Sequence, residues 1–236
     1  MKANKFITMS EIGLDSRVNL ENLFCIMQDF ITLTFGEIHL SNGEMRQKHH
    51  AIWVFTKNKV IVHERPHWNQ QVFINCRIVK VTPLLVYVKT DVVDKHKKAL
   101  FTGVTECCAI DYETFKFLKT SELKLPHKEE DVDTSYDFND SDVEFLRNVK
   151  VSMPLVDSSN HLNNAKAVLP LAESLSKEET LNIYSKPFEL GIKYCKQAML
   201  GEEICLFLGK DFDRINFAYK SKENQVLELG YIKSIN

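Results

Sequence analysis

The stretch VDSSNHLNN, residues 156–164, places six polar side chains and one histidine between two apolar segments. An imidazole titrates near neutral pH and can exchange a proton with a nucleophile, so His161 is a candidate general base. Asp157, four residues earlier, is placed to anchor the loop or to fix the tautomer of that histidine. The pattern indicates acid–base chemistry, although the same residues also suit a purely structural loop at the start of a helix.

A polar loop of this kind needs a strand before it and a helix after it. The free N–H groups at a helix start carry partial positive charge and stabilise an oxyanion or another anion. A base next to such donors favours acyl transfer. Ser159, inside the loop, is equally an ordinary capping residue.

Composition narrows the classes of partner. The chain has 236 residues and a formal net charge of -2, which is typical of a globular protein with one large or two small domains. A nucleic-acid binder normally shows a basic stripe, so no nucleic-acid partner is expected. No apolar run reaches the roughly 20 residues that span a bilayer, and MKANKFITMSEIG lacks the apolar core of a signal peptide. We therefore expect no membrane partner and a cytoplasmic location.

The cysteines and histidines give no pattern of a metal or cofactor site. His49 and His50, and the pair His63 and His67, lack a nearby cluster of carboxylates or cysteines, so neither a metal nor a cofactor is expected. Irregular spacing without a CxxC pair predicts reduced, mostly buried thiols rather than a disulfide framework, at Cys25, Cys76, Cys107, Cys108, Cys195 and Cys205.

The first half of the chain predicts a two-layer α+β unit. One long helix from Val18 to Phe35 follows from an apolar stripe at Leu20, Leu23, Phe24, Met27, Phe30, Ile31 and Thr34. After it, long runs of β-branched and aromatic residues are joined by short connections, which favours an antiparallel sheet. The runs are AIWVFTKNKVIVHE, QQVFINCRIVKV, LLVYVKTDVVD and ALFTGVTECCAIDY. A helix with one apolar face packs on such a sheet.

The second half repeats this order after a linker. Residues 124–148 are acidic and rich in turn-forming residues, which indicates a connecting segment. The segment Val149–Ser158 then lies over Ile7–Ser16 at one constant offset, which places Asp157 over Asp15. Further strand-like runs follow, NIYSKPFELGIKYCKQA, EEICLFLGKDF, RINFAYKS and VLELGYIKSI. A repeated order of strand, helix and antiparallel strands predicts an internal duplication.

The whole chain resembles the acyl-ACP thioesterases, which release fatty acids from acyl carrier protein. The resemblance rests on Met27-Gln28-Asp29, IWVFTKNKVIVHERPHWNQQVFI, TECCAIDYETFK, DSSNHLNN and YCKQAMLGEEI. It implies two tandem hotdog domains, each a long central helix wrapped by a curved antiparallel β-sheet. It also implies hydrolysis of a thioester, which needs an apolar tunnel for the acyl chain, expected against the first helix. The implied boundaries are residues 1–125 for the N-terminal domain, 126–146 for the linker and 147–236 for the C-terminal domain, which carries the catalytic loop.

The resemblance also implies a partner and a set of site residues. The partner is acyl carrier protein with its phosphopantetheine-linked fatty acyl chain, and the chain would act as a monomer or a homodimer. Basic residues such as Lys95-His96-Lys97-Lys98 are either solvated turns or a docking patch for the acidic carrier. The family pattern Asp-x-Asn-x-His-x-Asn-Asn falls on Asp157, Ser159, His161, Asn163 and Asn164, with the two asparagines expected to bind substrate.

The sequence departs from the family pattern at several positions. Ser159 stands where the family has a catalytic asparagine, and Gln197 stands where it has a carboxylate that activates water. A neutral amide cannot accept a proton as a carboxylate does. A cysteine nucleophile is disfavoured, because Ala198 occupies its position and Cys195 is out of register. Pro170 falls inside the expected second helix, where it would kink or shorten it.

These departures leave three hypotheses open. The first is an acyl-ACP thioesterase in which His161 and Asp157, helped by Ser159 and Gln197, orient or activate water. The second is a binding or regulatory protein that kept the acyl site but lost efficient chemistry. The third is a thioesterase acting on acyl-CoA.

Overall fold

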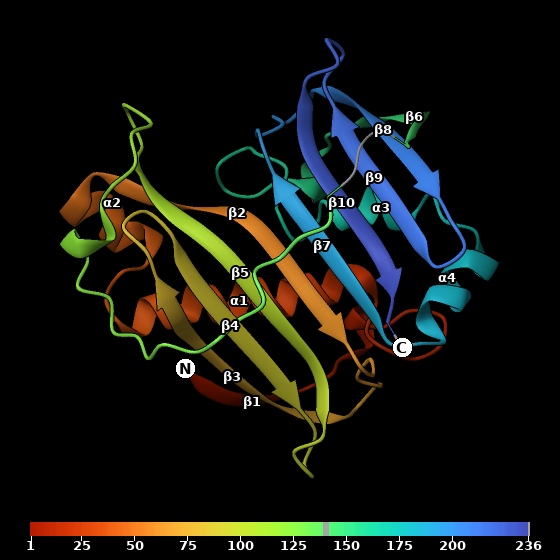
Figure 1. Cartoon of the computed structure of the whole chain (residues 1–236), viewed down its shortest axis with the longest axis horizontal. Helices are drawn as coiled ribbons and strands as arrows, with labels where there is room; N and C mark the ends of the chain where they lie inside the picture. The colour runs from red at the N-terminus through yellow and green to blue at the C-terminus, as the bar shows by residue number, and fades with distance from the viewer. Residues whose placement is uncertain (139–141, 236) are drawn as a thin grey trace.

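A computed structural model describes residues 1–138 and 142–235 of the chain. The described strands form one ten-stranded sheet in the order β1-β3-β4-β5-β2-β7-β10-β9-β8-β6, and every neighbouring pair is antiparallel (Figure 1). The strands are β1 (Lys2–Phe6), β2 (Ala51–Val62), β3 (Gln71–Val81), β4 (Val86–Val93), β5 (Ala99–Asp111), β6 (Glu144–Lys150), β7 (Phe188–Tyr194), β8 (Glu203–Lys210), β9 (Arg214–Lys220) and β10 (Val226–Ser234). The α-helices are α1 (Leu20–Glu37), α2 (Asn42–His49), α3 (Val168–Ala172) and α4 (Lys177–Tyr184), and three 3-10 turns are η1 (Met9–Glu11), η2 (Thr120–Glu122) and η3 (Met153–Leu155).

The first half has the predicted long helix on one face of its strands. The side chain of Asn19 accepts a hydrogen bond from the Asn22 N–H and so caps the start of α1. The predicted apolar stripe is buried, and Phe35 stacks on Trp53 of β2 with ring centroids 4.3 Å apart. The helix packs tightly on the sheet at Gly103, where a Cβ would overlap the side chain of Met27. The prediction of this helix is confirmed.

Residues 142–235 of the second half contain no long central helix. In its place, four turn residues lead into α3, which has five residues, and α4 follows with eight. The prediction of a long helix in each half is therefore wrong for the second half. Pro170 lies in the first turn of α3, where a backbone N–H would have no helical partner, so its lack of an N–H breaks no helical hydrogen bond. Its carbonyl accepts a hydrogen bond from the Ser174 hydroxyl.

The two halves share one continuous sheet. β2 of the first half pairs with β7 of the second from Lys57↔Lys193 to Val62↔Phe188. A second contact lies at the end of α4, where the guanidinium of Arg65 stacks 3.4 Å above the Tyr184 ring. The fold is therefore α+β with two tandem hotdog units.

The acidic connection crosses the face of the sheet opposite to α1 (Figure 1). Glu130 pairs with Arg77 and Asp133 pairs with Lys59, so outward-facing cations of the first half hold it in place. Residues 139–141 of the predicted linker lie outside the described residues. The domain boundaries drawn from the sequence stay a prediction.

Hydrogen bonds around two loops confirm the duplication but correct its register. The Gly13 N–H donates to the Arg17 carbonyl at 2.9 Å, and the Asp157 N–H donates to the His161 carbonyl at 3.0 Å. Asp157 therefore matches Gly13, two residues before the Asp15 that the sequence had placed opposite it. The loop geometry is fixed by these backbone bonds, so a shared Asp-Ser pair is a poor guide to register.

Within the described ranges, no single helix is long and apolar enough to cross a membrane. Only α1 and α2 taken together meet that test, across a bend of 44°.

Candidate active site

The loop 156–164 forms a tight turn closed by backbone bonds. Val156 and Leu162 make an antiparallel bridge, and the Asn160 N–H donates to the Asp157 carbonyl at 3.1 Å. Asn160 has a φ of 64°, a left-handed conformation that asparagine adopts more readily than most residues. The turn therefore displays Asp157, Ser159 and Asn160 to solvent while its base is fixed.

The segment after β7 lies directly beside this loop. The Leu162 N–H donates to the Ala198 carbonyl at 2.8 Å, and the Leu200 N–H donates to the Asn160 carbonyl at 2.9 Å. His161 and Met199 form a bridge between the two segments. The structure therefore brings Gln197 next to the loop that holds His161, although 36 positions separate them in the chain.

The predicted catalytic residues lie on two neighbouring segments, but their side chains are not joined by hydrogen bonds in the described part of the chain. The Oδ1 of Asp157 accepts from the Ser159 N–H at 2.8 Å, so this carboxylate braces its own turn. Among residues 1–138 and 142–235, no hydrogen bond joins the His161 imidazole to Asp157 or Gln197. The His161 ring is partly exposed, and Ser159 and Gln197 are exposed. Their catalytic roles stay predictions.

The two asparagines have different settings. The Oδ1 of Asn163 accepts from the Ala165 N–H at 2.9 Å, so Asn163 caps the turn that leads into α3, as Asn19 caps α1. Asn164 offers its backbone instead, since its carbonyl accepts from the Tyr194 hydroxyl at 3.0 Å. Substrate binding by Asn163 and Asn164 stays a prediction.

The N–H of Asn164 is open. In the described part of the chain it donates to no acceptor, whereas the matching N–H in the first half, that of Leu20, donates to the Tyr184 hydroxyl at 3.3 Å. A free backbone donor at the start of a turn and helix is suited to hold developing negative charge. This donor lies three positions after His161.

A buried polar chain that the sequence did not reveal supports the loop from below. The Thr105 hydroxyl donates to the Asn58 Oδ1 at 2.5 Å, and the Asn58 Nδ2 donates to the Tyr194 hydroxyl at 3.0 Å. The same Tyr194 hydroxyl donates to Asn164, so two strands of the first half help to fix the loop of the second. A polar Asn58 within the apolar run of β2 was the available signal, but its direction depends on a bulge between Phe55 and Lys57.

Cys195 lies near the loop but has the wrong electrostatics for a nucleophile. Partial burial raises the pKa of its thiol, with Glu228 adding to the effect and Lys193 opposing it. Since the thiolate is the reactive form, a raised pKa lowers reactivity.

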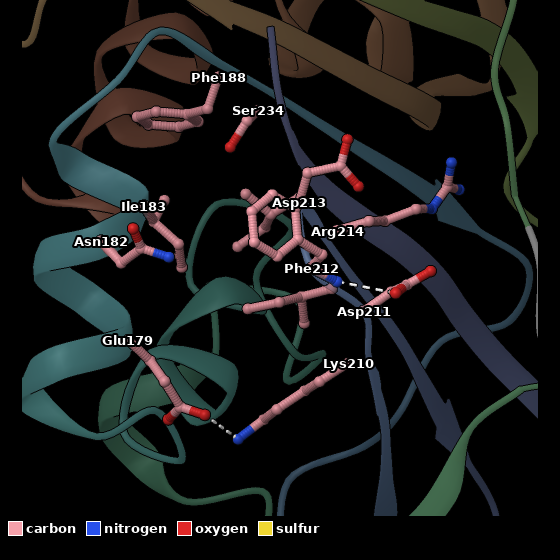
Figure 2. Close-up of a pocket in the computed structure, with 12 residues that line it drawn as sticks. Glu179, Asn182, Ile183, Phe188, Lys210, Asp211, Phe212, Asp213, Arg214 and Ser234 are labelled. Carbon is pink, nitrogen blue, oxygen red and sulfur yellow. Dashed lines mark hydrogen bonds and ion pairs between the residues drawn. The ribbon is translucent and has the colours of Figure 1, made fainter.

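A cavity of about 140 Å³ lies elsewhere in the second half, between α4 and the turn from β8 to β9 (Figure 2). Glu179 and Lys210, which form an ion pair, line it together with Asp211, Phe212 and Arg214. No residue of loop 156–164 lines this cavity. The predicted apolar tunnel against the first helix stays a prediction.

No protein-family model and no curated protein sequence matches this chain. Solved structures of similar fold do. An acyl-ACP thioesterase from Bacteroides thetaiotaomicron has a TM-score of 0.87 at 11% identity, covering 99% of this chain and 96% of its own. A 12:0-ACP thioesterase from Umbellularia californica has a TM-score of 0.81 at 13% identity, covering 99% and 96%. A protein described as an oleoyl thioesterase from Lactobacillus plantarum has a TM-score of 0.78 at 15% identity, covering 100% and 96%. The chain therefore has the fold of these thioesterase structures over its whole length.

Proposed function

We propose that the protein is a thioester hydrolase that releases free fatty acid from acyl carrier protein. The observation that carries this proposal is the second-half loop, where His161 and the open Asn164 N–H lie beside the segment of Gln197. The likeness in fold to three thioesterase structures over at least 99% of this chain supports the same reaction.

In the proposed reaction a water molecule attacks the thioester carbonyl carbon. His161 accepts the proton of that water, and the Asn164 N–H donates to the carbonyl oxygen as it becomes negative. The tetrahedral intermediate then breaks its carbon–sulfur bond, and the proton on His161 passes to the leaving sulfur. Asp157 holds the turn through its bond to the Ser159 N–H, and the Gln197 amide and Ser159 hydroxyl help to orient the water.

One observation favours a second candidate, an acyl-thioester binding protein with weakened chemistry. No carboxylate is hydrogen-bonded to the His161 ring within the described residues, and Gln197 is neutral. Such a protein would bind acyl-ACP and release little fatty acid.

A direct assay separates the two. The purified chain is incubated with acyl-ACPs of several chain lengths, and fatty acid release and equilibrium binding are both measured. Release from at least one member supports the hydrolase, and binding without release above background supports the binding protein. The same panel on coenzyme A shows which carrier is preferred. With acyl-ACP as substrate we place the protein in fatty acid biosynthesis.

A further inference from the structure

Three side chains on neighbouring strands form a row beneath the candidate active site. Glu228 of β10 pairs with Tyr194 of β7 on one side and with Tyr219 of β9 on the other. Both tyrosines point to the inner face, since their hydroxyls donate to the carbonyls of Asn164 at 3.0 Å and Ala167 at 2.8 Å. Directly paired residues of an antiparallel sheet share a face. Glu228 therefore points inward between the two tyrosines, under residues 164–167.

The carboxyl of Glu228 is buried without a full set of partners. The residue is 5% exposed, and within the described residues its Oε2 has no hydrogen bond. Burial raises its pKa to about 8, so the carboxyl is neutral at pH 7 and offers both an O–H donor and an oxygen acceptor. Leaving such a group buried and unpaired destabilises a folded protein, and a ligand that satisfied its hydrogen bonds would remove that penalty.

The first half shows that the fold does not need a polar row here. The Cys195 N–H donates to the Leu227 carbonyl at 2.8 Å, just as the His63 N–H donates to the Leu100 carbonyl at 2.9 Å. The residue matching Glu228 is thus Phe101, which pairs with Val62 and Val92. All three residues of that first-half row are buried and apolar. The same backbone therefore packs well with hydrocarbon alone.

The row of Tyr194, Glu228 and Tyr219 lies on the inner face of the sheet, next to the proposed oxyanion donor. Tyr194 contacts Asn164, whose N–H is the proposed oxyanion donor, and the strand of Tyr194 leads within three residues to Gln197. In the proposed reaction, an acyl chain whose carbonyl is held at that N–H would enter the interior past these side chains. Resting on the proposed function, this places Glu228 beside the first carbons of the chain.

We propose that Glu228, between Tyr194 and Tyr219, recognises a hydroxyl group on the acyl chain near the thioester, so that hydroxyacyl thioesters are preferred over saturated ones. A hydroxyl matches the carboxyl because it accepts from the O–H and donates to the free oxygen. A saturated chain would leave the carboxyl unpaired and so binds less well.

The test compares 3-hydroxydodecanoyl-ACP with dodecanoyl-ACP as substrates. We expect wild type to favour the hydroxylated chain in kcat/KM by about tenfold or more, and Glu228→Leu to bring the ratio of the two towards one. Glu228→Gln, which keeps a donor and an acceptor, should retain part of the preference. Phe101→Leu, the matched position in the first half, should change both substrates alike. Equal use of the two by wild type, or an unchanged ratio in Glu228→Leu, would overturn the proposal.

Two further measurements keep the test decisive. Thermal unfolding confirms that each variant is folded, and Glu228→Met replaces Glu228→Leu if the latter is not. If no thioester is hydrolysed, the proposed hydrolase fails, and equilibrium binding of the same two acyl-ACPs then decides the recognition site. Tighter binding of the hydroxylated chain that is lost in Glu228→Leu supports the site, and equal binding overturns it.

Discussion

The two loops that start the two halves have the same backbone hydrogen bonds but different side chains at matched positions. In the first half Arg17 lies where His161 lies in the second, and Arg65 lies where Gln197 lies. Arg65 is 4% exposed and pairs with Asp15, while Arg17 donates to Glu64 at 3.0 Å. The first loop is thus closed by ion pairs.

The second loop has none of these closures in the described residues. Within the described residues no ion pair forms at His161, and Gln197 carries no charge. The Asn164 N–H is open, whereas the matching Leu20 N–H donates to the Tyr184 hydroxyl. The contrast is that side-chain bonds close the first turn, whereas the second leaves the Asn164 N–H unbonded, as the proposed function requires. Variants at matched positions should therefore change stability in the first loop and turnover in the second.

The largest effect on stability is expected at Arg65. Arg65→Ala leaves Asp15 without its ion-pair partner and removes the ring stacking on Tyr184, so the free energy of unfolding should fall by about 3 kcal/mol. Gln197→Ala, at the matched exposed position, should change it by less than about 0.5 kcal/mol. Urea unfolding of both variants measures the difference, and equal losses would contradict the contrast between the loops.

Glu228 predicts a dependence of stability on pH. Its folded pKa of about 8 lies above the ordinary 4.5, so the folded state holds a proton that the unfolded state releases. Stability should therefore be complete below about pH 4.5 and decline until about pH 8. Relative to Glu228→Gln, which does not titrate, wild type should lose about 2 kcal/mol or more across that window. Parallel curves for the two proteins in urea unfolding would refute the buried carboxyl.

A smaller gain is expected from restoring a carboxylate beside His161. Gln197→Glu supplies a group that accepts a proton and orients the imidazole, so kcat should rise about tenfold. Arg65→Glu is not a usable control because it reverses a buried charge, and Gln197→Met serves instead. Steady-state hydrolysis of acyl-ACP measures kcat, and a carboxylate variant no faster than wild type would show that position 197 takes no part in activating water.

The smallest effects are expected at the two capping asparagines. Asn19→Ala and Asn163→Ala should each lower the free energy of unfolding by about 1 kcal/mol, because each removes a bond to a backbone N–H. Only Asn163→Ala should also reduce turnover, since it loosens the turn that holds the open Asn164 N–H. A reduction of kcat by both variants, or by neither, argues against a structural role for the first loop and a catalytic role for the second.

Sequence periodicity was sufficient for the elements with one buried face. The apolar stripe of α1 and the β-branched strands of the first half were predicted. The strand-to-helix junction expected at His161 is instead a loop between η3 and a turn. Pro170 indicated a shortened helix, but the turn that replaces it depends on tertiary contacts. The row of Glu228 could not be predicted, because the face of a strand residue is set by its pairing partners.

The central claim, that only the second loop is catalytic, is tested most directly by comparing His161→Ala with Arg17→Ala. Both remove a side chain from the same place in a duplicated turn. The measurement is single-turnover release of fatty acid from the best acyl-ACP substrate, with thermal unfolding as the check on folding. We expect His161→Ala to lose at least about 100-fold in rate and Arg17→Ala to keep the wild-type rate at lower stability. Wild-type release by His161→Ala, or equal losses in the two variants, would contradict this assignment.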